Sequence, residues 1–149
     1  MMNTSKYSLD SNAIDSPESD YLYVSQSQIT NAGQGLFTAI PIYKDEIIAV
    51  FKGEILTDKE SEKRALEGKD AYFMNLLNGS ILDCKNTECF AKYANDTFGF
   101  SKSELKNNSK IALDENENVC LIAIKKIQIG EEIFCDYGKK YWKKRILKT

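Results

Sequence analysis

The chemistry open to this chain is limited first by a residue type that it lacks, because none of its 149 residues is histidine. Without histidine there is no Ser-His or Cys-His nucleophile pair, and the commonest general base is missing. The four cysteines contain no CxxC pair, and their spacings fit no common zinc site. We therefore expect no metal centre, and small buried thiols rather than disulfides. The cysteines are Cys84, Cys89, Cys120 and Cys135.

A pair of glycines is the first segment that suits ligand binding. Gly33 and Gly35 flank Gln34 directly before a strand pattern that begins at Leu36. Two glycines let a backbone turn tightly and approach a ligand closely. The third glycine and the helix of a dinucleotide fingerprint do not follow. Alone, this segment predicts only a turn.

The most informative segment is the block 127–138, which reads IQIGEEIFCDYG. A DYG tripeptide alone predicts only the end of a strand and a turn. Three earlier segments accompany the block in the chain. They are VFKGE at 50–54, YFM at 72–74 with ILD at 81–83, and AKYANDT at 91–97 with NNS at 107–109. Their order and register are much more specific than any one of them.

Taken together, these segments resemble the SET domain, a family of protein lysine methyltransferases that use S-adenosylmethionine (AdoMet). The glycine pair is similar to the family's GxG turn, VFKGE to its strand ending in YxGE, and the block 127–138 to its motif IxxGEE(L/I)xxDYG. The resemblance covers residues 21–142. Cysteine-rich zinc segments flank some SET domains and are absent here, so the chain resembles the minimal stand-alone form.

The segment 91–109 shows where the chain departs from the family, whose motif there is ARFINHS…PN. Asp96 replaces the histidine, Asn107 replaces the proline, and the insert 98–106 is longer than usual. These changes affect side-chain contacts, whereas main-chain N–H and C=O groups can still meet adenine. The matching residues are Ala91, Asn95 and Asn108, and the mild substitutions are Lys92 for arginine and Tyr93 for phenylalanine.

The resemblance implies a mainly β fold, the β-clip of SET domains, with several small sheets, few short helices and a C-terminal pseudoknot. In the pseudoknot the C-terminal segment threads under the loop that carries the Asn motif, which would bring Asn95 and Tyr137 together. The SET domain is expected to span residues 21–138. Residues 1–20, rich in Ser, Asp and Asn, are expected to form a disordered arm. The basic segment 139–149 is expected to complete the cofactor site.

Local patterns predict many short strands and few helices, which favours a mainly β fold. Thr57 is a good N-cap and Glu60 completes a capping box, so a helix should begin at Asp58. The strands are expected at 21–24, 36–40, 46–51, 81–82, 111–113, 119–124 and 132–135. The helices are expected at 58–67, 89–94 and 141–147.

The family's site residues carry over to the matching positions of this chain. Tyr137 and Tyr72 are the expected catalytic residues. Tyr137 would orient the substrate amine, and Tyr72 would also line the lysine channel. The product would be S-adenosylhomocysteine, and no metal would take part. The residues expected to bind AdoMet are Gly33, Gln34, Gly35, Leu36, Lys92, Tyr93, Asn95, Asp96, Tyr137 and Trp142. The residues expected to line the channel for the substrate lysine are Tyr72, Ile111, Phe134, Cys135 and Tyr137.

Two of these assignments have an alternative. Trp142, the single tryptophan, either packs on adenine, as aromatic residues just beyond the DYG do in several SET domains, or anchors the terminal helix to the core. Lys92 either faces the carboxylate of AdoMet or is a surface lysine.

The number of methyl groups added is expected to exceed one. In the family, a tyrosine two residues before the catalytic tyrosine restricts the product to monomethyl-lysine. That position is Cys135 in this chain, which is smaller. In some members a tyrosine three residues after the PN asparagine fills the same space, and here that position is Ile111. The resemblance therefore predicts di- or trimethylation.

Charge and composition limit the partners. The net charge of −2 and pI of about 5.3 exclude a generic nucleic-acid binder. Segment 139–149 carries six basic residues and no acid, so it is either a solvated face or a weak contact for nucleosomes or DNA. Residues 1–20 lack the apolar region of a secretory signal, and no stretch suits a membrane span. We expect a soluble, intracellular protein of the nucleus or cytoplasm, or of the host cell if its source is a virus or intracellular bacterium.

The expected substrate is a histone or another basic protein. Two other interpretations remain at this point. A catalytically inactive SET fold that binds a protein is suggested by Asp96, and a DNA or nucleosome adaptor by the basic segment 139–149.

Overall fold

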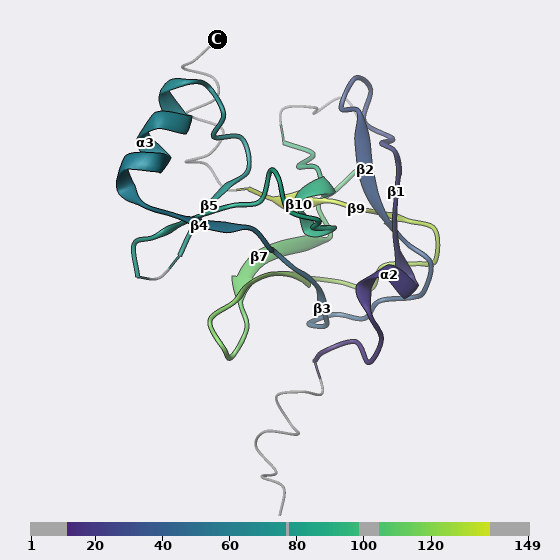
Figure 1. The fold of residues 1–149 in the computed structure, drawn as a ribbon. Coiled ribbons are helices and arrows are strands. Elements are labelled where there is room, and N and C mark those ends of the chain that lie inside the picture. Colours follow the sequence, from purple (N-terminus) through teal and green to yellow (C-terminus); the bar gives the residue numbers. More distant parts are fainter. Residues whose placement is uncertain (1–11, 77, 99–104, 138–149) are drawn as a thin grey trace, which may run out of the picture.

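The computed structural model describes residues 12–76, 78–98 and 105–137, and its elements are short and mostly strands (Figure 1). The helical elements are α2 (Glu18–Tyr21), α3 (Asp58–Leu66) and the 3-10 turn η1 (Ala91–Tyr93). The strands are β1 (Leu22–Gln26), β2 (Gln34–Thr38), β3 (Ile47–Val50), β4 (Glu54–Leu56), β5 (Phe73–Asn75), β6 (Ile81–Asp83), β7 (Ser109–Leu113), β8 (Val119–Ala123), β9 (Glu132–Ile133) and β10 (Cys135–Asp136).

The strands form three small sheets, with the orders β1-β2-β9, β10-β7-β8-β3 and β4-β6-β5. All described strand pairs are antiparallel except β10 with β7. Figure 1 shows β1 and β2 at one side, α3 with β4 and β5 at the other, and the C-terminal strands crossing between them. The expected mainly β architecture of several small sheets is confirmed.

Most predicted elements agree with these bounds, but α2 was not predicted and β5 was expected only from the family resemblance. Strand β4 was not predicted, because its three residues show no alternation. The strand predicted at 132–135 is split at Phe134 into β9 and β10, since its two halves pair with different sheets. The helix predicted at 89–94 is only a single 3-10 turn. The helix predicted at 141–147 lies outside the described residues.

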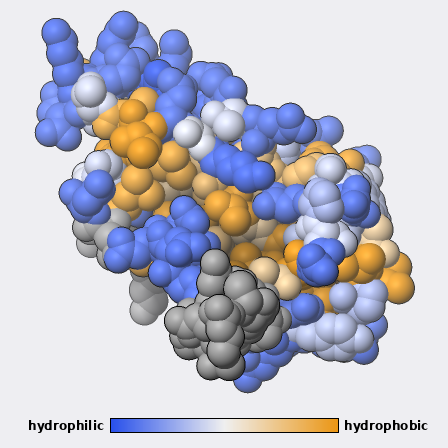
Figure 2. Space-filling view, turned by 60° about the horizontal axis from the view of Figure 1, so that its bottom comes forward, coloured by the Kyte–Doolittle hydropathy of each residue, from blue (hydrophilic) through white to orange (hydrophobic). Residues whose placement is uncertain are grey.

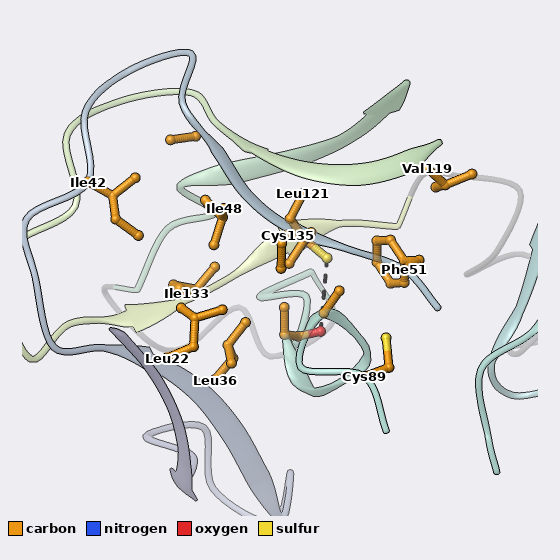
Figure 3. Packing of buried hydrophobic residues seen from close by; sticks show 14 of the residues in the cluster. Leu22, Leu36, Ile42, Ile48, Phe51, Cys89, Val119, Leu121, Ile133 and Cys135 are labelled. Carbon is orange, nitrogen blue, oxygen red and sulfur yellow. Dashed lines mark hydrogen bonds between the residues drawn. The ribbon is translucent and has the colours of Figure 1, made fainter. Parts of the chain in front are cut away.

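The core is one cluster to which all three sheets contribute, mainly through the sheets containing β2, β3 and β8 (Figure 3). Leu36, Leu121 and Ile133 are fully enclosed in it. Most of their neighbours along these strands are buried as well, so both faces of the strands are covered. All four cysteines are buried and free, as predicted for thiols used as small hydrophobes. The core therefore backs the strands that carry the expected site.

The chain before β1 is attached to the edge of β3. Residue Ala13 forms a parallel bridge with Ile47, the Glu18 carboxylate accepts a hydrogen bond from the Val50 N–H, and the Tyr21 hydroxyl donates to the Ile48 carbonyl. Burial raises the pKa of Tyr21 far above its usual value, so this hydroxyl remains a donor. Ordered structure thus extends back to residue 12, and residues 1–11 lie outside the described part.

Helix α3 begins where the capping box predicts, because the Thr57 hydroxyl accepts a hydrogen bond from the Glu60 N–H at 3.2 Å. Arg64 then fixes the helix to the sheet below. Its guanidinium donates to the Asp83 carboxylate at 2.8 Å, to Glu60 at 2.9 Å and to Glu54 at 3.2 Å. Since Asp83 is 1% exposed, its carboxylate depends on this partner.

The surface drawn in Figure 2 is mostly hydrophilic and is crossed by a broken band of hydrophobic residues. Ile55, Leu66 and Ile129 are the most exposed large aliphatic side chains of the described residues. No helix in the described part of the chain is long and apolar enough to cross a membrane. Among those same residues, no group of three or more His, Cys, Asp or Glu side chains could hold a metal ion.

We predict that Arg64→Gln lowers the melting temperature, because it leaves the buried Asp83 carboxylate without its cation. Lys63→Gln is the matched control, since Lys63 is an exposed cation on the same helix. Thermal unfolding followed by circular dichroism should show a larger decrease for Arg64→Gln. Equal melting temperatures of the two variants would contradict the role given to Arg64.

Candidate active site

The expected site residues surround the C-terminal segment formed by Glu132–Asp136 and Tyr137. This segment lies between strands β2 and β7, which are far apart in the sequence. Strand β9 pairs with β2, and β10 pairs with β7. At the change of partner, Phe134 forms a parallel bridge with Asn95. The C-terminal segment thus contacts both halves of the Asn motif, 91–97 and 107–109, and the glycine segment as well.

Asn108 completes the hydrogen bonding of this segment with its side chain. Its amide nitrogen Nδ2 donates to the Glu132 carbonyl at 2.9 Å, and its Oδ1 accepts from the Phe134 N–H at 2.9 Å. The side chain thereby takes the place of a neighbouring strand. Asn108 is 4% exposed, so both contacts replace hydrogen bonds to water.

Asn95 joins the glycine segment to the C-terminal segment. Its carbonyl accepts a hydrogen bond from the Cys135 N–H at 2.9 Å, and its Nδ2 donates to the Gln34 carbonyl at 2.9 Å. The structure therefore brings Gln34, Asn95 and Cys135, one predicted residue from each of three motifs, into one place. The expectation that Asn95 and Tyr137 come together is met, because the residues on either side of Asn95 hold Tyr137.

Tyr137 is held at both its main chain and its side chain. Its N–H donates to the Asp96 carboxylate at 2.9 Å, and its phenolic hydroxyl donates to the Ala94 carbonyl. The two acceptors are only two residues apart in the chain. The orientation of the phenol ring relative to Asn95 is therefore fixed by one short segment.

Cys135 lies within the core next to this tyrosine, and Figure 3 shows its thiol directed at a carbonyl oxygen. The acceptor is Ala94, with a sulfur–oxygen distance of 3.9 Å. Burial, and after it the nearby charge of Asp96, raise the pKa of the Cys135 thiol well above its usual value. The thiol therefore stays neutral, and the site gains no negative charge from it.

The two glycines of the GxG segment differ in their surroundings. A Cβ on Gly35 would lie 2.1 Å from the Glu132 Oε2, so the buried Glu132 carboxylate requires glycine there. That carboxylate accepts hydrogen bonds at 2.7 Å from the Ser27 hydroxyl and from the Gln28 N–H. Gly33 has a φ of 77° and no atom within 4 Å of the position of a Cβ. Its backbone is therefore open to a ligand.

Lys92 occupies a cage made by its own chain. Its ammonium nitrogen Nζ donates to the carbonyls of Cys84, Lys85 and Thr87 at 3.0–3.2 Å. The same nitrogen lies 5.8 Å from the centre of the Tyr72 ring and 5.4 Å from that of Tyr93. These carbonyls and rings stabilise the Lys92 ammonium group without a ligand. The same ammonium group lies near both Tyr72 and Tyr93.

The remaining predicted residues are distributed as follows. The side chain of Leu36 is fully buried in the core, so only its main chain can face a cofactor. Phe134 is buried, whereas Ile111 is partly exposed and packs against the core. Tyr72 is 38% exposed. Trp142 lies outside the described residues.

Sequence reasoning missed several residues that hold the site. The carbonyl of Ala94 was not identifiable, because a main-chain acceptor has no side-chain signature. Glu132 had a signal, since it is a carboxylate between Gly130 and the apolar pair Ile133-Phe134, where an exposed residue would not be expected. Asn107 was recognised only as a departure from the family motif.

The fold and the site together define a class of protein in which several small β sheets meet at an inserted C-terminal segment flanked by glycine and asparagine motifs. The sequence profile described as "SET domain" matches residues 33–138, which is more than half of the chain. The chain therefore belongs to the SET-domain family.

Known relatives show the same similarity. The chain is 29% identical over 110 residues to histone-lysine N-methyltransferase mes-2 of Caenorhabditis elegans, a match that covers 72% of this chain and 14% of that protein. An apo structure of ctPRC2 with two mutations in Ezh2 has a TM-score of 0.66 and 28% identity, and covers 83% of this chain and 16% of that chain.

A humanized mutant of the Chaetomium thermophilum Polycomb Repressive Complex 2, bound to an inhibitor, has a TM-score of 0.65 and 25% identity. This match covers 78% of this chain and 15% of the other. The chain thus spans about a sixth of these relatives or less.

We predict that Asn108→Ala lowers the free energy of unfolding by about 1–3 kcal/mol, because the buried Phe134 N–H loses its acceptor. Asn116→Ala is the matched control, since Asn116 is exposed in the turn between β7 and β8. Urea unfolding at equilibrium measures both. A loss no greater than that of the control would show that the Asn108 side chain does not hold the C-terminal segment.

Proposed function

We propose that this chain is an AdoMet-dependent protein lysine N-methyltransferase. The observation that carries the proposal is the fixed position of Tyr137, whose N–H and hydroxyl are both bound by the segment 94–96. Membership of the SET family and the named function of the mes-2 relative support the same reaction. The retained Tyr137 argues against the inactive interpretation.

The residues around Gly33 and Asn95 fit AdoMet. The backbone at Gly33 is sterically open, and Asn95 holds that strand against the C-terminal segment. When bound, AdoMet supplies a methyl group activated by a positively charged sulfur. We assign its binding to the main chain at Gly33–Leu36 and 93–96, with Tyr137 and, beyond the described residues, Trp142.

The chain must also hold a neutral amine in line with the methyl group. Free lysine has a pKa near 10.4, and an apolar channel lowers it by disfavouring the ammonium form. Phe134, Ile111 and the neutral Cys135 thiol contribute apolar surface and no charge of their own to the proposed channel. The ammonium group releases its proton to solvent water before methyl transfer, so no histidine base is needed. Tyr137 orients the amine, and alignment of this kind can supply about 7–11 kcal/mol.

The proposed substrate is a histone or another basic protein, since the named relatives are a histone-lysine methyltransferase and Polycomb assemblies. Incubation with labelled AdoMet, core histones and a lysate of the source cell tests this, with the labelled band identified by mass spectrometry. AdoMet binding measured by calorimetry separates an active enzyme from an inactive SET fold. Binding to DNA that is salt-sensitive and survives loss of Tyr137 would instead support the adaptor.

We predict that Tyr137→Phe reduces turnover by more than about tenfold, a loss above about 1.4 kcal/mol, while AdoMet binding stays nearly intact. The reason is that only the hydroxyl that orients the amine is removed. Tyr23→Phe is the matched control, because Tyr23 lies on β1 and stacks on Phe37. Turnover of the Tyr137 variant above a tenth of wild type would show that Tyr137 is not the catalytic tyrosine.

We predict that the wild-type product carries two or three methyl groups, because the described residues place no hydroxyl at Cys135 or Ile111 to restrain a methylated amine. Ile111→Tyr should shift the product toward monomethyl-lysine, whereas Ile111→Phe should not, since it adds the ring without the hydroxyl. Ile111 suits this test better than Cys135, whose fully buried side chain leaves no room for a tyrosine. Mass spectrometry at long reaction times decides, and a wild-type product that stops at one methyl group would contradict the prediction.

A further inference from the structure

Asp96 has the most highly connected carboxylate near Tyr137. It is 2% exposed, and its Oδ1 accepts hydrogen bonds from the Phe98 N–H and from the Asn107 Nδ2, each at 2.9 Å. Its Oδ2 accepts the Tyr137 N–H, also at 2.9 Å. One side chain thereby joins the first residue of the insert 98–106, and the residue that follows the insert, to the C-terminal segment.

Asn107 closes the same arrangement from the opposite side. While its Nδ2 donates to Asp96, its Oδ1 accepts from the Thr97 N–H at 3.0 Å and from the Thr97 hydroxyl at 2.9 Å. Both the nitrogen and the oxygen of the Asn107 amide are therefore engaged. Proline at 107 would offer neither group, and histidine at 96 could not accept three N–H groups at once.

We propose that Asp96 and Asn107 form a matched pair, the Asp96–Asn107 clasp, in which Asp96 is a positioning residue for Tyr137. The two larger substitutions in the family motif, Asp96 for histidine and Asn107 for proline, are thus bonded to each other. The inference rests on the proposed function insofar as it concerns turnover. Its structural half, the attachment of Tyr137, does not depend on any reaction.

The clasp positions Tyr137 because Asp96 holds its main chain while Ala94 holds its hydroxyl. Hydrogen bonds from N–H groups to a buried carboxylate are among the stronger ones, since the acceptor is charged. Without the Asp96 contact, the Tyr137 main chain would lose its hydrogen bond to the segment 94–96, while the bond from its hydroxyl to Ala94 would remain. The clasp therefore determines how precisely the phenol of Tyr137 is aligned in the site.

Exchange of the two side chains gives a sharp test. In Asp96→Asn, one carboxylate oxygen becomes an NH2 group, which must face either the Tyr137 N–H or the donors of Asn107 and Phe98. In the double variant with Asn107→Asp, the amide introduced at position 96 can accept from Tyr137 and donate to the carboxylate introduced at position 107. Only the Phe98 N–H then loses its partner, so the double variant should recover what the single variant loses.

The expected results are a kcat about 10–100-fold lower in Asp96→Asn and at least about fivefold higher in the double variant than in that single variant. KM for the protein substrate should change little. Hydrogen exchange at the Tyr137 amide, followed by NMR with tyrosine-specific isotope labelling, should accelerate about tenfold or more in Asp96→Asn and slow again in the double variant.

Asp114→Asn is the matched control. Like Asp96, Asp114 accepts two main-chain N–H groups, from Asn116 and Asn118, and a carboxamide Nδ2, that of Asn118. It lies in the turn between β7 and β8, away from the clasp. Its variant should lose thermal stability but leave kcat within about twofold of wild type and Tyr137 exchange unchanged.

Asn107→Asp alone adds a pH readout. It places two carboxylates within hydrogen-bonding distance, which raises the pKa of one of them. Since the folded-state pKa is then above the unfolded value, the variant is destabilised above that pKa and the loss diminishes as the pH falls. Its deficit in melting temperature should be smaller at about pH 5 than at about pH 8.

Three results would overturn the clasp. They are unchanged Tyr137 exchange in Asp96→Asn, equal defects in the single and double variants while both unfold cooperatively, and a pH-independent deficit in Asn107→Asp. If Asp96→Asn does not fold, Asn107→Ala replaces it, and unchanged Tyr137 exchange there has the same meaning. Failure of methyl transfer in the wild type, with the exchange pattern intact, would instead contradict only the proposed function.

Discussion

The structure depends on one constraint, the change of sheet partner at Phe134. Strand β9 belongs to the sheet of β2 and strand β10 to the sheet of β7, so the main chain between them has no regular ladder. Buried N–H and C=O groups must still be paired. The Asn108 side chain accepts the Phe134 N–H, and the Phe134 carbonyl accepts the N–H groups of Asn108 and Ser109. The Cys135 N–H donates to the Asn95 carbonyl. The asparagines of this motif therefore have a structural role, which is to pair the main chain of the crossing segment.

The same constraint explains why the glycine motif and the GEE motif belong together. Glu132 lies at the start of the crossing segment and is 1% exposed, so its carboxylate needs donors, which Ser27 and the Gln28 N–H supply. Its position excludes a side chain at Gly35. Gly33, by contrast, is open. One glycine of the pair therefore serves the fold and the other leaves the backbone accessible to a ligand.

Much of the fold could be predicted because strands such as β2, β3 and β8 are buried apolar runs bounded by turns, and because Thr57 marks the start of α3. The meeting of Gln34, Asn95 and Tyr137 could be expected only from the family resemblance, since no local pattern encodes a contact across 61 residues. The partners of Lys92 and Asp96 were not predictable. Carbonyls of a loop and the amide of Asn107 become neighbours only after the chain is folded.

These distances in sequence also make the site inseparable from the fold. The contacts that define it join residues 26, 41, 61 and 105 positions apart, and closing such loops costs entropy that only the complete set of contacts offsets. A chain that has formed β1 and β2 but not the crossing of β9 and β10 has no attached Tyr137. Asp96 illustrates this dependence, because its carboxylate can bind Tyr137 only when the C-terminal segment lies beside β7. Alignment of the tyrosine therefore requires the completed fold.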